Sequence, residues 1–225
     1  MILQLILLEI RSLLRMRRLR QLAIANSIIV FSIGFYSISM SKSPTSMHAL
    51  WVLGMMSMIP LSTGFFAYSK DGAFFDALRA RPIKGHRFVM AKYYFYTAIC
   101  WAGLVSVITI DSLTSSTQLA FSFAIFCFCA GYMIPFILLL ATFDSYRIDT
   151  SRSTFSNNEG VHWGRKSLVL VPFFVFFVSP ELAIKWQYFL LGIGGIGLLA
   201  HRIVLYKLAH LLKKRKYIML EGFRQ

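Results

Sequence analysis

Few residues of this 225-residue chain have the types and spacing that chemistry requires. The three cysteines, Cys100, Cys127 and Cys129, lie in apolar runs without CxxC spacing and without a histidine at a metal-binding interval. Cys127 and Cys129 would point to different sides of a helix, so no disulfide between them is expected. The chain also lacks a GxxxxGK[ST] nucleotide-binding loop. We therefore expect core cysteines, and we expect no catalytic residue, metal or cofactor in this chain.

A glycine-rich stretch, Gly-Ile-Gly-Gly-Ile-Gly at 192–197, matches the GxGxxG pattern of dinucleotide-binding turns. That turn needs a preceding strand, whereas this stretch lies inside a long apolar run. Small residues in such a run let two helices approach closely. The stretch therefore predicts close helix packing.

Composition excludes a soluble enzyme. Hydrophobic residues make up 57% of the chain and charged residues 15%, whereas a soluble domain is roughly half apolar and a quarter charged. The net charge of +15 would suggest nucleic acid for a soluble protein. In a membrane protein, such cations mark the cytoplasmic ends of the helices. The chain is therefore predicted to be an all-α membrane protein that contacts lipids and no nucleic acid.

Six apolar segments approach the roughly 20 residues that a helix needs to cross a bilayer. The fifth is short and contains Pro172 and Pro180, so it could be tilted or partly re-entrant. Together the six segments form a predicted transmembrane domain over 22–212. The predicted spans are 22–40, 48–68, 91–111, 118–143, 167–180 and 187–207.

Charge placement supports this topology. With the N-terminus inside, every Lys and Arg except Lys42 and Lys185 falls on the cytoplasmic side. This asymmetry follows the positive-inside rule. Both termini are therefore predicted to be cytoplasmic, with a basic tail over 213–225.

Residues 1–21 are predicted to form an amphipathic helix along the cytoplasmic membrane surface. Arg11, Arg15 and Arg18 are spaced i, i+4 and i+7, which places them on one helix face. A secretory signal carries its basic part first, and this stretch has the reverse order. No cleavage is expected here.

Polar groups inside the predicted spans are mostly hydroxyls, and almost no buried charge is expected. This argues against an ion-coupled carrier. The hydroxyls could face a path for an amphipathic molecule or only bond their own helix backbones. They belong to Ser57, Ser62, Thr63, Ser106 and Thr109.

The second cytoplasmic segment is the most informative. Ser69 can cap a helix that Pro82 ends, giving a short helix over about 69–82. This amphipathic helix could float at the lipid interface, or it could dock on a partner. Its apolar face consists of Phe74, Phe75 and Leu78, and the framing charges are Asp71, Asp76, Arg79 and Arg81.

This segment resembles the cytoplasmic coupling region of ABC-2-type permeases, the membrane subunits of many ABC exporters. The family pattern is Arg-Glu-x-Gly-Thr, an acidic residue, Leu-Leu, then Pro-Ile and a Lys that opens the third span. About 25 residues carry the likeness, and the plan of spans agrees over the whole chain. Asp for Glu, Lys for Arg and a missing Thr leave the subgroup open. The matching positions are Lys70-Asp71, Gly72, Asp76, Leu78, Pro82-Ile83 and Lys92.

The resemblance implies a permease subunit of an ABC exporter in the bacterial inner membrane. A separate cytoplasmic ATPase subunit would bind ATP and Mg, and this chain would pair with itself or a similar permease. Phe74, Phe75 and Leu78 would be the apolar anchors of the ATPase contact. The framing charges would set its register, and the N-terminal arginines would be a second contact or a lipid anchor.

Two other functions stay open. A membrane-embedded lipid-modifying enzyme would need clustered Asp, His or Arg at one membrane face. Asp71-Gly72 with the later arginines is similar to the DGxxAR motif of lipid-head-group transferases, but the spacing differs. A non-transporting scaffold or sensor would share the topology and need no ATPase.

Overall fold

The computed structural model describes residues 2–40, 46–74, 85–114, 119–144, 187–215, 217–219 and 221. Every element in these ranges is a helix, which confirms the all-α prediction. The helices are α1 (Ile2–Arg15), α2 (Arg17–Met40), α3 (Ser46–Gly64), the 3₁₀ helix η1 (Ser69–Phe74), α5 (Gly85–Thr114), α6 (Leu119–Phe128), the π-helical η2 (Cys129–Met133), α7 (Ile134–Ala141) and α10 (Gln187–Lys214).

Three helices in the described residues are long and apolar enough to cross a membrane, not six. They span Gly85–Ser112, Leu119–Ala141 and Gln187–Lys214, and they indicate a multi-pass membrane protein. The predicted spans 22–40 and 48–68 coincide with α2 and α3, which do not meet the same criterion. Arginines open α2, and the apolar part of α3 is the shorter Leu50–Gly64. The predicted fifth span, 167–180, lies outside the described residues.

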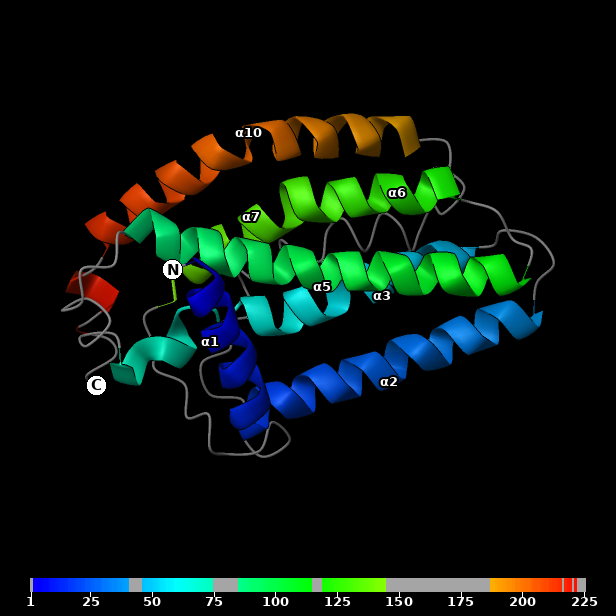
Figure 1. Cartoon of the computed structure of the whole chain (residues 1–225), viewed down its shortest axis with the longest axis horizontal. Coiled ribbons are helices and arrows are strands. Elements are labelled where there is room, and N and C mark those ends of the chain that lie inside the picture. Colours follow the sequence, from blue (N-terminus) through cyan, green and yellow to red (C-terminus); the bar gives the residue numbers. More distant parts are fainter. Residues whose placement is uncertain are drawn as a thin grey trace.

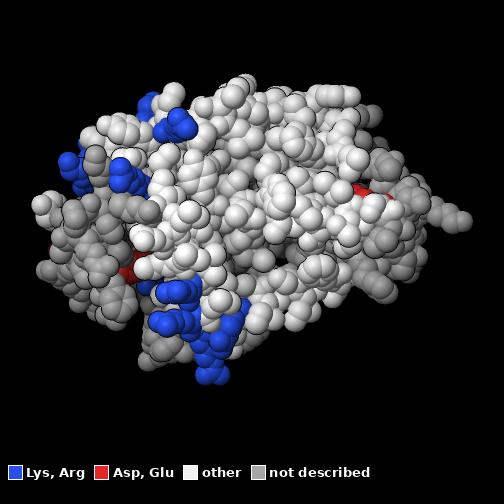
Figure 2. Space-filling view, in the orientation of Figure 1, with Lys and Arg blue, Asp and Glu red and all other residues white. Residues whose placement is uncertain are grey.

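The long helices run side by side, and α1 lies across one end of them (Figure 1). Both chain ends are at this same end. Lys and Arg side chains gather there, over the last turns of α10 and around the start of α2 (Figure 2). The charged end predicted from the sequence is therefore one end of the helix bundle.

The α6–η2–α7 segment is one helix interrupted by a π turn. Pro135 lacks a backbone N–H, and in a regular α-helix its ring would meet the carbonyl of Gly131. For one turn just before Pro135 the helix is a wider π-helix. There the N–H of Ile134 donates to the carbonyl oxygen of Cys129, five residues earlier. The π turn therefore lets the helix continue through Pro135.

Close packing at glycines joins this helix to α10. A Cβ atom added to Gly131 would lie 2.1 Å from the carbonyl oxygen of Gly194, and one added to Gly194 would lie 2.3 Å from the carbonyl carbon of Cys127. Gly197 makes a similar approach to Gly131. The expectation that 192–197 serves close helix packing is confirmed.

The structure also shows the surroundings of the cysteines and hydroxyl groups inside the helices. The three cysteines are free and buried. Each of the five named hydroxyls donates to a backbone carbonyl three or four residues earlier in its own helix, which is the second of the two alternatives above.

The glycine contact generates a prediction. Gly194→Ala would force a methyl group against the Cys127 backbone, so we expect it to cost about 1–3 kcal/mol of unfolding free energy. Gly192→Ala is the matched control, because open space surrounds that position. Alanine there should be neutral or stabilising by roughly 0.5–1 kcal/mol. Thermal unfolding in detergent measures both, and equal effects would contradict the packing account.

Candidate functional site: a buried ion cluster

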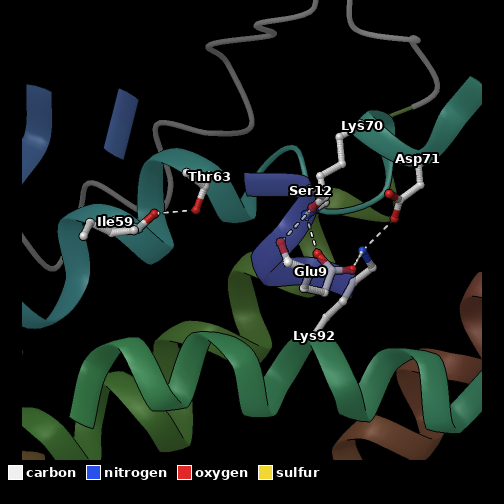
Figure 3. A network of polar contacts seen from close by, with 7 residues as sticks. All are labelled: Glu9, Ser12, Ile59, Thr63, Lys70, Asp71 and Lys92. Atoms are coloured by element: carbon white, nitrogen blue, oxygen red, sulfur yellow. Dashed lines mark hydrogen bonds and ion pairs between the residues drawn. The ribbon is translucent and has the colours of Figure 1, made fainter. Parts of the chain in front are cut away.

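Four ionisable side chains from three elements meet where α1 crosses the bundle (Figure 3). Glu9 comes from α1, Lys70 and Asp71 from η1, and Lys92 from α5. Their side chains are between 0 and 9% exposed. We call these four residues the ion cluster. It joins segments that are 61 and 83 residues apart in the chain.

Each carboxylate of the ion cluster is neutralised by an ammonium group. Lys92 Nζ donates to Glu9 Oε1 at 2.5 Å and to Asp71 Oδ2 at 2.7 Å. Lys70 Nζ donates to Glu9 Oε2 and, at 3.2 Å, to the Ser12 hydroxyl. Ser12 in turn donates to the Glu9 backbone carbonyl at 2.8 Å. Two positive and two negative charges therefore balance within one site.

Aromatic rings enclose the Lys92 side of the ion cluster. The Lys92 ammonium lies 4.6 Å from the ring centroid of Phe88 and 5.6 Å from that of Tyr68. Both rings can attract a cation through their faces. They also keep water away, which strengthens the ion pairs that form there.

The cluster shifts the pKa values of its members outside the membrane helices. Burial alone would raise the pKa of Glu9, but the ammonium groups of Lys92 and Lys70 lower it to about 2. Burial alone would lower the pKa of Lys70, but Glu9 and Asp71 raise it above its ordinary value. Both groups therefore stay charged over the whole physiological pH range.

The arrangement suits a structural link between segments more than a reaction centre. Every charge of the ion cluster is bonded to an opposite charge and shielded from solvent. The described residues contain no group of three or more His, Cys, Asp or Glu that could hold a metal ion. Losing one partner would leave an uncompensated buried charge, so each of the three segments depends on the others for neutrality.

The structure places the predicted coupling residues only in part. Asp71 lies in the ion cluster, rather than on an exposed docking face. Phe74 is the last residue of η1. The remaining predicted coupling residues lie outside the described ranges: Phe75, Asp76, Leu78, Arg79 and Arg81.

The N-terminal arginines do not share one face. The predicted helix over 1–21 is divided at Met16, so Arg11 and Arg15 belong to α1 and Arg18 to α2. Arg11 and Arg15 are exposed. Arg18 is buried, and its guanidinium carbon lies 5.4 Å from the centroid of the Phe66 ring. The i, i+4, i+7 spacing predicted one face because it assumed an unbroken helix.

Sequence reasoning missed two features of the ion cluster. Glu9 is the one carboxylate in an otherwise apolar and basic stretch, and that isolation was the available signal. The expectation of almost no buried charge in the spans is wrong at Lys92, which is fully buried in α5. Only the fold brings Glu9 to it.

The ion cluster predicts an asymmetric response along α1. Glu9→Gln leaves two buried lysines with one carboxylate, and breaking such a site typically costs about 3–5 kcal/mol of unfolding free energy. Arg11→Gln, on the exposed side of the same helix, should change it by less than about 0.5 kcal/mol. Chemical unfolding in detergent at pH 7 compares the two variants.

A comparison of wild type with Glu9→Gln also tests the low pKa of Glu9. The advantage of wild type over Glu9→Gln should be constant between pH 5 and 8 and should shrink from about pH 4.3 toward pH 2. In that window the unfolded chain binds a proton that folded Glu9 does not. An advantage already lost between pH 7 and pH 5 would contradict the cluster as described.

Comparison with known proteins gives one family. No curated protein and no solved structure matches the chain. One family model, described as "Family of unknown function (DUF5687)", matches residues 1–225. The chain therefore belongs to the DUF5687 family.

Proposed function

We propose that this protein is the transmembrane permease subunit of an ABC exporter in the bacterial inner membrane. In this proposal the chain has six spans and cytoplasmic termini. It forms the translocation path as a dimer with itself or a similar permease. A separate cytoplasmic ATPase subunit binds ATP and Mg and drives the transport cycle. The chain itself is not an enzyme.

The ion cluster is the observation that carries this proposal. Lys70 and Asp71 open the segment that resembles a coupling region, and Lys92 stands at the position of the family lysine in the third span. Asp71 and Lys92 are bonded to each other, and Lys92 and Lys70 both bond Glu9 of α1. A push on the segment after η1 would therefore reach α5 and α1 directly. Coupling of ATP hydrolysis to helix movement needs such a connection.

The arrangement of charges supports the topology. Cations gather at one end of the bundle (Figure 2), the end at which α1 lies (Figure 1). Three helices long and apolar enough to cross a membrane overlap the predicted spans 91–111, 118–143 and 187–207, and the shorter or less apolar helices α3 and α2 overlap 48–68 and 22–40. Six spans with the basic end in the cytoplasm are the arrangement that this pattern favours.

The two alternatives gain less support. A lipid-modifying enzyme needs ionisable groups that a substrate can reach, and the groups of the ion cluster are shielded and paired with one another. A scaffold or sensor needs no rigid link between a cytoplasmic segment and a span. The ATPase experiment below distinguishes it from a transporter.

The topology can be tested by cysteine labelling in a cysteine-free background. Ser43→Cys and Ser115→Cys, in the predicted outer loops, should react with an impermeant thiol reagent on intact cells. Lys213→Cys, which is exposed near the end of α10, should react only after the membrane is opened. Labelling of Lys213→Cys from outside would contradict the proposed orientation.

Coupling to an ATPase can be tested by co-purification in detergent at fixed salt. Removing one interface anchor typically costs about 2–4 kcal/mol, or roughly 30- to 1,000-fold in affinity. We therefore expect Phe75→Ala to release the ATPase, and Asp76→Lys to do so by reversing a registering charge. Both variants should still insert and dimerise.

Phe123→Ala is the matched control for this experiment. Phe123 is an exposed aromatic residue of α6, a helix whose first turns lie near the bundle end opposite α1 (Figure 1). It should leave ATPase recovery unchanged. If Phe75→Ala and Asp76→Lys also leave recovery and ATPase turnover unchanged, the coupling assignment fails.

A further inference from the structure

An apolar cleft of about 590 Å³ opens between the α6–η2–α7 helix and α10. Aromatic residues Tyr132 and Phe136 line one wall, and aliphatic residues such as Ile196 and Val204 line the other. Among the described residues that line it, Lys207 is the one charged side chain. The cleft is separate from the ion cluster, and neither the proposed function nor the family assigns it a role.

The glycine crossing explains why the cleft exists. Backbone contact at Gly131 and Gly194 holds α6 and η2 close to α10. Beyond the π turn, α7 makes far fewer contacts with α10. The two helices therefore separate toward the end of the bundle that carries the cations, and the cleft lies in this widening.

The aromatic wall of the cleft is flat and regular. The rings of Tyr132 and Phe136, which line the cleft, stack with centroids 5.8 Å apart. Behind them the buried ring of Phe128, outside the cleft lining, stacks on Tyr132 with centroids 5.5 Å apart. These residues are four positions apart, so they follow one helix face. A wall of this kind can pack along a straight hydrocarbon chain and offers few polar partners.

The charge of Lys207 favours a ligand with an anionic head group. Lys207 lines the cleft from α10 between Val204 and Leu211, and the basic last turn with Lys213 and Lys214 follows. An ammonium group on the wall of an apolar cleft complements a molecule with a hydrocarbon chain and an anionic head. Phospholipids of the cytoplasmic leaflet have this chemistry, and each Lys or Arg near an anionic surface contributes about 1 kcal/mol to its binding.

We propose that this cleft is a binding site for an anionic phospholipid, with one acyl chain against Tyr132 and Phe136 and the phosphate at Lys207. The site requires membrane insertion but does not rest on the transporter proposal. It differs from general attraction to the basic end of α10 because it needs both Lys207 and the open cleft.

Native mass spectrometry of the purified protein tests the site, without an ATPase. The protein is titrated with phosphatidylglycerol and with phosphatidylethanolamine of identical acyl chains. Wild type should retain phosphatidylglycerol preferentially. Lys207→Gln should weaken its binding about fivefold, which is what about 1 kcal/mol converts to, and should weaken phosphatidylethanolamine less, because the ammonium group of that lipid already offsets its phosphate charge. Lys213→Gln removes the same charge outside the cleft lining and should have less than a twofold effect.

A second pair of variants tests the cleft itself. Ala200→Phe places a ring in the cleft and should weaken binding of both lipids. Leu199→Phe adds similar bulk at the neighbouring position, which is 88% exposed and does not line the cleft, and should change neither. If Ala200→Phe does not fold, the Lys207 and Lys213 pair decides alone.

Three results would overturn the proposal. Equal effects of Lys207→Gln and Lys213→Gln would show diffuse attraction to the basic end. Unchanged binding to folded Ala200→Phe would place the lipid elsewhere. Retention of neither lipid by wild type would mean that protein, rather than lipid, covers the cleft.

Discussion

Two lysines and two carboxylates share one buried site in this protein, and none of these charges would be stable there without an opposite charge beside it. Moving a single charge out of water costs several kcal/mol, so each group requires its opposite. Glu9 is the central member because both lysines bond to it. The position of α1 across the bundle, the path of the chain through η1 and the burial of Lys92 in α5 all depend on this neutrality.

The break between α1 and α2 at Met16 follows from the same constraint. Glu9 must face α5 while α2 runs alongside the other long helices, so residues 2–40 cannot form one straight helix. Arg18 then falls on α2, where Phe66 covers it. The exposed side of α1 keeps Arg11 and Arg15 together with the apolar residues Leu3, Leu7 and Leu14. This surface suits the cytoplasmic face of a membrane.

A second contact, between glycines, organises the other half of the bundle. Gly131, which lies within the π turn before Pro135, and Gly194 bring two backbones together. One crossing thus provides tight packing on one side and an open apolar cleft on the other. Charge joins α1, η1 and α5, and close backbone contact joins the α6–η2 segment to α10.

The sequence by itself determined the helical class, the apolar character of the helices, the cationic end and the use of 192–197 for packing. Each depends on composition or on short periodic patterns, which can be recognised within a single segment of the sequence. Lys70, Asp71 and Lys92 were also visible as motif positions, but only Asp71 was given a role, as a framing charge of a docking surface. Only the tertiary structure decided that they are buried against Glu9, that Arg18 leaves the face of Arg11 and Arg15, and that Lys207 lines an apolar cleft. These features depend on contacts between residues far apart in the chain, because neutralising a buried charge is a property of the site and not of the segment that supplies it.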